Sequence, residues 1–166
     1  MIKRMALATL LLACAGLWSA PALGSITCSV SANGVTFGVY NPLSGGNLDR
    51  NGSITFKCTS NTILSSGTVT FDVTLSRGSS GSFTTRAMNS GSDTLEYNLY
   101  VGSLRNTIWD DGKGSTGSRS GTFQFPSILS IGIVREASFT IYGRVFGGQF
   151  VPAGGYSDAI TVTVLY

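Results

Sequence analysis

The sequence predicts an all-β domain, either a sandwich or a barrel, in a protein that is exported from the cell. Apolar and polar residues alternate with a period of two along most of the chain. Glycine-containing turn signals separate the alternating stretches, and no 3.6-residue apolar stripe is present. Short alternating segments of this kind are typical of antiparallel sheets, in which one face is buried and the other meets solvent.

The clearest alternation predicts strands in several parts of the chain. In each, every second residue is apolar and most of the residues between are polar, so one face would pack against a core. The segments are Ile54–Cys58, Val69–Leu75, Leu95–Val101, Phe139–Val145 and Ile160–Tyr166.

Turns are predicted where glycine follows or accompanies small polar residues. Residues 112–121 are rich in glycine and serine and are predicted to form one loop. The turn signals are Asn33-Gly34, Ser44–Asn47, Asn51-Gly52, Arg77–Gly81 and Asp111–Gly114.

The N-terminus is predicted to be a secretory signal peptide over residues 1–24. Two basic residues precede a short apolar run, and small residues follow it up to Gly24. Cleavage after Gly24 is expected, with cleavage after Ala22 as the alternative. A lipoprotein signal with lipid on Cys14 is the competing interpretation, because the letters LLAC resemble a lipobox.

Residues 25–166 are predicted to form a single domain. Removing 24 of the 166 residues leaves 142, which suits one domain. Of 11 Lys+Arg and 8 Asp+Glu, two basic residues lie in the signal, so the mature balance is 9 − 8 = +1. This balance argues against a nucleic-acid partner, which would need a basic stripe. No second apolar run is long enough to span a bilayer, so an integral membrane protein is not expected.

The mature chain retains two cysteines, Cys28 and Cys58. An isolated pair in an exported chain predicts one disulfide bond. A metal or redox site would need closely spaced cysteines or histidines, and the sequence has no histidine. No cofactor and no metal ion are therefore expected.

The sequence offers little material for catalysis. Without histidine there is no Ser-His-Asp triad, and no Gly-x-Ser-x-Gly, Walker or dinucleotide-binding motif occurs. Asp110-Asp111 is interpreted as a solvated acidic turn rather than an ion site, because it lacks the alternating carboxylates of a calcium loop. Trp109 is interpreted as a lid on the core, with a sugar-stacking platform as the alternative. Asn51-Gly52-Ser53 matches a glycosylation sequon, for which a turn is the favoured interpretation.

Several stretches of the mature chain resemble the spore coat U family, which includes subunits of the archaic, Csu-type chaperone–usher pili. The similarity extends from Cys28 to Tyr166, and Asp110 departs from the glycine that the family usually has there. It is carried by the letters VTFGVYNP, LSRGSSGSFTTRAM, LEYNLYV, IWDDGKG and YGRVFGGQFVPAGGYSDAITVTVLY, in this order.

The resemblance implies an incomplete immunoglobulin-like sandwich that lacks its last strand and receives it from a partner. The implied partners are a periplasmic chaperone, an outer-membrane usher and neighbouring pilus subunits. A groove for the donated strand is expected along four inward residues: Phe71, Val73, Ile141 and Val162.

Subunits that donate a strand carry an alternating extension of about ten residues before the first cysteine, and here only Ser25–Thr27 precede Cys28 if cleavage follows Gly24. Three residues cannot fill a groove, since an extended chain covers about 3.3–3.6 Å per residue. The chain is therefore expected to accept a strand, to donate none, and to end the fibre.

The sequence thus predicts a secreted, non-enzymatic subunit of a pilus or spore coat, carried through the periplasm to the cell surface. A free-standing secreted or lipid-anchored binding module is the alternative. Candidate contact loops are the residues Ile108, Trp109, Asp110 and Asp111 with the following turn, and the stretch Phe123–Ile133, whose apolar residues could instead pack inside the sandwich.

Overall fold

The computed structural model describes residues 26–62, 66–113, 117–127 and 131–166, and these form two antiparallel sheets. The expected signal peptide, with its cleavage sites and Cys14, lies outside the described residues. The elements in chain order are β1 (Ile26–Asn33), the 3₁₀ turn η1 (Pro42–Ser44), β2 (Leu48–Ser60), β3 (Gly67–Leu75), β4 (Arg86–Ser90), β5 (Asp93–Tyr100), β6 (Arg119–Phe125), β7 (Val134–Val145) and β8 (Val162–Leu165).

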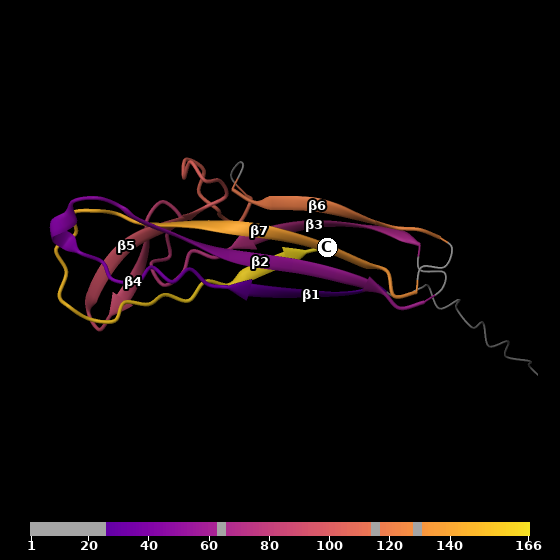
Figure 1. Ribbon diagram of the computed structural model, residues 1–166, viewed down its shortest axis with the longest axis horizontal. Helices are drawn as coiled ribbons and strands as arrows, with labels where there is room; N and C mark the ends of the chain where they lie inside the picture. The colour runs from indigo at the N-terminus through magenta and orange to yellow at the C-terminus, as the bar shows by residue number, and fades with distance from the viewer. Residues whose placement is uncertain (1–25, 63–65, 114–116, 128–130) are drawn as a thin grey trace, which may run out of the picture.

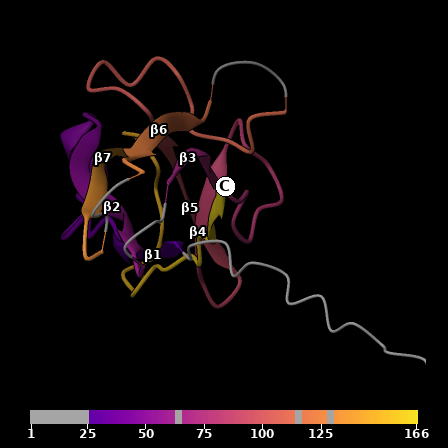
Figure 2. The same cartoon turned by 90° about the vertical axis from the view of Figure 1, so that its right-hand side faces the viewer.

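The two sheets pack as an immunoglobulin-like sandwich, so the predicted all-β fold class is confirmed (Figures 1 and 2). One sheet has the strand order β1-β2-β7-β5-β4, and the other has the order β6-β3-β8. The central pair β2–β7 is in register from Leu48 opposite Val145 to Thr59 opposite Val134. No helix among the described residues is long and apolar enough to cross a membrane.

Aromatic side chains from both sheets form the centre of the core. The rings of Phe56 and Phe71 lie 4.7 Å apart, and those of Phe71 and Phe123 lie 4.8 Å apart. Gly121 allows this packing, because a Cβ there would lie 2.6 Å from the Phe71 ring. The alternation in the sequence therefore has the expected meaning, because the apolar residues of each strand lie on the face that packs into the core.

Two predicted boundaries are wrong. Asn51-Gly52 is not a turn but lies inside β2, where Asn51 pairs with Tyr142 and Gly52 with Ile141. A Cβ on Gly52 would lie 2.6 Å from the carbonyl oxygen of Asn33, so this glycine serves a close backbone approach rather than a bend. The predicted loop 112–121 also ends early, because β6 begins at Arg119.

Candidate functional site

A mainly apolar groove lies between an edge of each sheet. Strand β1 ends one sheet and β8 ends the other. Two segments without regular strand structure, residues 34–41 and 151–161, continue these edges and, with the adjoining Ala32, Pro42 and Val162, form the walls of a cavity of about 990 Å³. Its floor consists of core side chains: Leu75, Met88, Leu95, Tyr97, Leu99, Ile141 and Val145.

The first wall lies against the sheet because glycine makes room for it. A Cβ on Gly143 would lie 2.8 Å from Val35 and 2.9 Å from the ring of Phe37. With hydrogen in that place, Phe37 packs edge-on against Tyr97, with ring centroids 5.8 Å apart. The wall is thus fixed by side-chain packing rather than by strand pairing.

The second wall is held by the carboxylate of Asp158. This group accepts hydrogen bonds from the hydroxyl of Tyr97 at 2.7 Å and from the backbone N–H groups of Ser79 at 2.9 Å and Ala159 at 2.8 Å. Burial, and then the bond to Asp158, raise the pKa of Tyr97 well above its usual range. Tyr97 therefore remains a neutral donor, and it links the floor of the groove to its wall.

A bridge of backbone hydrogen bonds completes this wall. The N–H of Asn89 donates to the carbonyl of Ser157 at 2.8 Å, and the N–H of Ser157 donates back to Asn89 at 3.1 Å. The segment 151–162 is thereby tied to β4, the far edge of the five-stranded sheet.

Core-facing residues of the two edge strands β1 and β8 remain partly uncovered. Val30 lies opposite Phe56, and Ala32 lies opposite Ile54, so both point to the core side of the sheet. Yet Val30 is 46% exposed. On β8, Val162 lies opposite the buried Leu75 and is only half-buried. One more strand placed along this opening would cover these side chains and pair with free backbone groups at the edge.

The structure brings together two of the four residues expected in the groove. Ile141 forms part of the floor, and Val162 forms part of a wall. Phe71 and Val73 do not line the groove, because they are enclosed in the core beneath it. Strand alternation identifies the residues that point toward the core. It does not tell which of them are covered by another strand and which are exposed in the groove.

The predicted disulfide bond between Cys28 and Cys58 is present. The two residues face each other directly across the β1–β2 ladder. Because the bond closes a sequence separation of 30 residues, it fastens the edge strand β1 beside the groove.

The candidate contact loop around Trp109 is anchored in the core. The Trp109 side chain is 0% exposed, and its Nε1–H donates to the carbonyl of Val73 at 2.9 Å. Its ring is therefore not presented to a ligand. Asp110 and Asp111 accept bonds from the N–H groups of Gly112 and Lys113, which shapes a turn, and Ile108 is half-buried.

The second candidate contact stretch divides into buried and exposed parts. Phe123 and Phe125 are buried on β6, whereas Ile131 is 61% exposed. Residues 128–130 lie outside the described residues. Where side chains are described, no group of three or more His, Cys, Asp or Glu residues gathers as metal ligands would.

A buried arginine that the sequence analysis did not single out lies on β4, the strand that pairs with β5. Arg86 is 0% exposed and donates to the carbonyls of Ser76 and Trp109 and to Oδ1 of Asn98, at distances of 2.7–3.0 Å. Asn98 in turn donates to the carbonyls of residues 83 and 84 at 2.8 and 2.9 Å. Burial lowers the pKa of the Arg86 guanidinium. This network joins four segments, and its only sequence signal is that Arg86 lies within the stretch LSRGSSGSFTTRAM.

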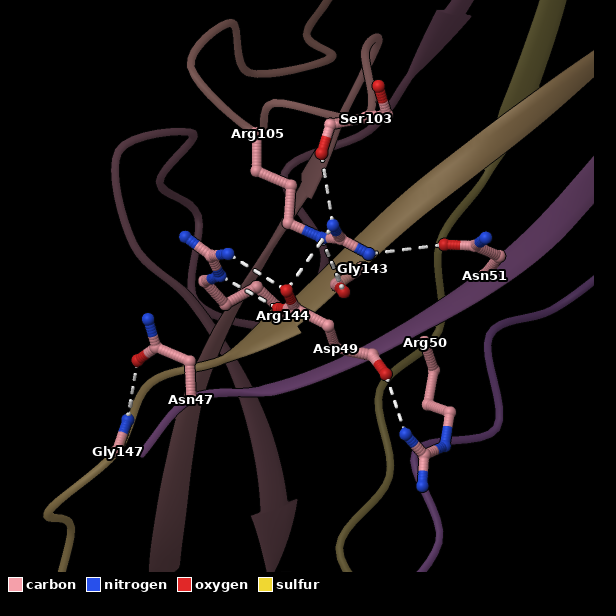
Figure 3. Close-up of polar contacts among 9 residues, drawn as sticks. All are labelled: Asn47, Asp49, Arg50, Asn51, Ser103, Arg105, Gly143, Arg144 and Gly147. Carbon is pink, nitrogen blue, oxygen red and sulfur yellow. Dashed lines mark hydrogen bonds and ion pairs between the residues drawn. The ribbon is translucent and has the colours of Figure 1, made fainter. Parts of the chain in front are cut away.

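A second polar cluster lies around Asp49, where strands β2 and β7 meet the loop that follows β5 (Figure 3). Arg144 binds both carboxylate oxygens of Asp49 at 2.8 Å, and Arg105 lies 3.3 Å from the same carboxylate. Arg105 also donates to the carbonyl of Gly143 and to Asn51, both at 3.2 Å. The hydrogen bonds from Arg144 lower the pKa of Asp49. Because its donors already have protein partners, this cluster fastens a loop to the sheet.

Comparisons with known proteins agree with the fold. Residues 17–163 match the family described as the Spore Coat Protein U domain. Protein U of Myxococcus xanthus is 28% identical over 151 residues, which cover 86% of this chain and 76% of that protein.

A solved structure shares the fold. It is the pre-assembly complex of the chaperone CsuC with the tip adhesion subunit CsuE, from the archaic chaperone–usher Csu pili of Acinetobacter baumannii. The similarity has a TM-score of 0.54 at 22% identity and covers 86% of this chain. The chain spans 40% of the length of that solved chain.

Proposed function

Because the chain belongs to the Spore Coat Protein U domain family, we propose that it is a secreted structural subunit of a bacterial surface fibre, a chaperone–usher pilus or a spore coat. Its role is structural or adhesive, and we propose no catalytic activity. In this proposal the chain crosses the periplasm with a chaperone, passes an outer-membrane usher and joins neighbouring subunits at the cell surface.

The observation that carries the proposal is the open groove. A hollow of about 990 Å³ with a floor of core side chains is larger than a packed domain tolerates in its interior. Its lining is mainly apolar, and it lies between two strand edges. These features suit an extended segment that adds backbone hydrogen bonds along an edge and buries alternate side chains.

We further propose that the chain accepts a strand, donates none and occupies the end of the fibre. In support of this proposal, residues 26–28 of β1 are already paired with residues 58–60 of β2 and are engaged within their own domain. A donated strand would need residues before Ile26, and the expected cleavage after Gly24 removes nearly all of these.

The test is expression of the mature chain in a periplasm with and without its cognate chaperone. Alone, the chain should aggregate or be degraded, and with the chaperone it should form a soluble complex. A synthetic peptide that copies the alternating N-terminal segment of a neighbouring subunit should raise the Tm. At 100 times its Kd, such a ligand stabilises by about 2.7 kcal/mol, which corresponds to roughly 10 °C for a domain of this size.

Two variants on β8 provide a matched comparison. Val162→Asp places a carboxylate in the groove wall and should abolish the peptide effect, whereas Leu165→Asp changes a side chain that is 63% exposed and should leave it intact. A chain that is a soluble monomer on its own, melts cooperatively and ignores the peptide would instead be a free-standing binding module.

A further inference from the structure

Three large apolar side chains are exposed on η1 and on the segments beside it, residues 38–41 and 147–150. The segment that contains η1 lies at one end of the molecule (Figure 1). Val39, Leu43 and Phe150 are 92%, 83% and 80% exposed, respectively. We call these three residues the apolar pole. Isolated apolar residues on a surface are ordinary, but a group of this kind often marks an interaction site.

The pole is built as one unit from two loops that are distant in the sequence. The N–H of Gln149 donates to the hydroxyl of Tyr40 at 2.8 Å, and the N–H of Gly147 donates to the side chain of Asn47 at 3.0 Å. A Cβ on Gly147 would lie 2.5 Å from the carbonyl oxygen of Gly45, so the loops touch through backbone atoms. The pole is therefore a firm surface.

The pole adjoins the groove through Val39. Val39 belongs to both, because it also lines the groove together with Tyr40, Pro42 and Val151. The first wall approaches the pole along residues 32–42, and the second wall leaves it along residues 151–162 toward β8. A chain that lies in the groove and continues past Val39 therefore passes beside the pole.

The direction of an added strand follows from the pairing at β8. Every ladder between described strands is antiparallel, and antiparallel pairing is slightly more stable for each residue than parallel pairing. β8 runs away from the pole, so an antiparallel partner runs toward it. The donated segment precedes the domain of its own subunit, and that domain consequently emerges at the pole.

We propose that the apolar pole is the surface on which the folded domain of the strand-donating neighbour packs. The inference rests on the proposed function, since it concerns the protein whose strand fills the groove. The donated strand fixes the position of the neighbour. Contact of its folded domain with Val39, Leu43 and Phe150 then adds to the affinity between the two subunits.

Photo-crosslinking in the assembled fibre tests this proposal. A crosslinking amino acid at Val162 identifies the neighbour by its N-terminal segment. The same group at Leu43 or Phe150 should then form crosslinks with the folded domain of that same protein. Leu104 is the matched control, because it is 81% exposed but lies on the loop after β5, and it should form no such crosslink.

Substitution gives an independent readout. In the variant with both Leu43→Asp and Phe150→Asp, the N-terminal peptide should raise the Tm as in the wild type, while the dissociation constant for the whole neighbour should rise about tenfold or more. Leu104→Asp should change neither quantity. If the peptide does not raise the Tm of the wild-type chain, the proposed function and this inference are both overturned.

Other results would overturn only the inference. These are crosslinks from Leu43 or Phe150 to a different protein, crosslinks to none, or an equal loss of affinity in Leu104→Asp. If the double variant binds the neighbour normally but attaches less well to an apolar surface such as polystyrene, the pole is an adhesive surface instead.

Discussion

Replacement of Arg86 by methionine should destabilise the domain severely, although the side chain is far from any expected ligand. Arg86→Met leaves the buried carbonyls of Ser76 and Trp109 without the donor that Arg86 supplies, while Oδ1 of Asn98 keeps only its bond from the N–H of Leu99. Each unsatisfied buried acceptor costs about 1–3 kcal/mol. The methionine side chain offsets part of this cost, because it needs no desolvation of a charge.

The expected net loss is about 3 kcal/mol, or roughly 10 °C in Tm for a domain of this size. Arg86→Lys should recover only a small part, since one ammonium group cannot reach three acceptors that a planar guanidinium spans. Differential scanning fluorimetry of the mature chain, with all variants measured under the same conditions, checks the result.

The control for this experiment is a second arginine, Arg77, which contacts the same aromatic ring as Arg86. Arg77 is exposed and its guanidinium is 4.8 Å from the ring centroid of Phe83, against 5.4 Å for Arg86. Arg77→Met removes a similar cation–π contact without exposing buried acceptors, and it should cost under about 1 kcal/mol. If Arg77→Met and Arg86→Met melt within about 2 °C of each other, the argument from unsatisfied acceptors is refuted.

The remaining predictions concern the edge strand, an ion pair and a glycine. Replacing Cys28 and Cys58 together by serine should cost about 3–4 kcal/mol in the loop-entropy model, measured by chemical denaturation; an unchanged midpoint would contradict it. The folded state lowers the pKa of Asp49, so its stabilising effect is complete above the usual aspartate pKa and is lost as the pH falls through the folded value. Asp49→Asn should therefore reduce the decline of Tm below about pH 4, and parallel wild-type and variant curves would count against it. Gly52→Ala should lower the Tm because its Cβ would meet the carbonyl of Asn33 at 2.6 Å, whereas Gly34→Ala, with nothing within 4 Å, serves as the control.

The strands and the disulfide bond could be predicted from the sequence because both depend on local patterns. Each alternating segment lies in or beside an observed strand, and two cysteines in an exported chain leave one pairing. The limits of the segments were less predictable: β2 extends back to Leu48, through the predicted turn at Asn51-Gly52. Asparagine followed by glycine favours a turn. Here, however, the glycine is needed because the backbone of another part of the chain, at Asn33, lies too close to leave room for a Cβ.

The groove could be predicted only in outline. Its walls follow no strand periodicity, since Val35, Phe37 and Asp158 are placed by contacts with residues far along the chain. The burial of Arg86 was also hidden, because an arginine that alternates with apolar residues on a strand is ordinarily read as solvent-facing. Such residues become recognisable only when their distant partners are known.

The long register between β2 and β7 has a mechanical consequence. The two strands run along the longest axis of the molecule and face each other from Leu48–Val145 to Thr59–Val134 (Figure 1). Hydrogen bonds of an antiparallel ladder lie across the strands. Tension applied between the two ends of the molecule would therefore load these bonds in shear, and many would have to break together rather than open one after another. A thin domain of this shape would hold its length under pulling, and would yield first where a wall is fastened by only a few bonds, as at Asp158.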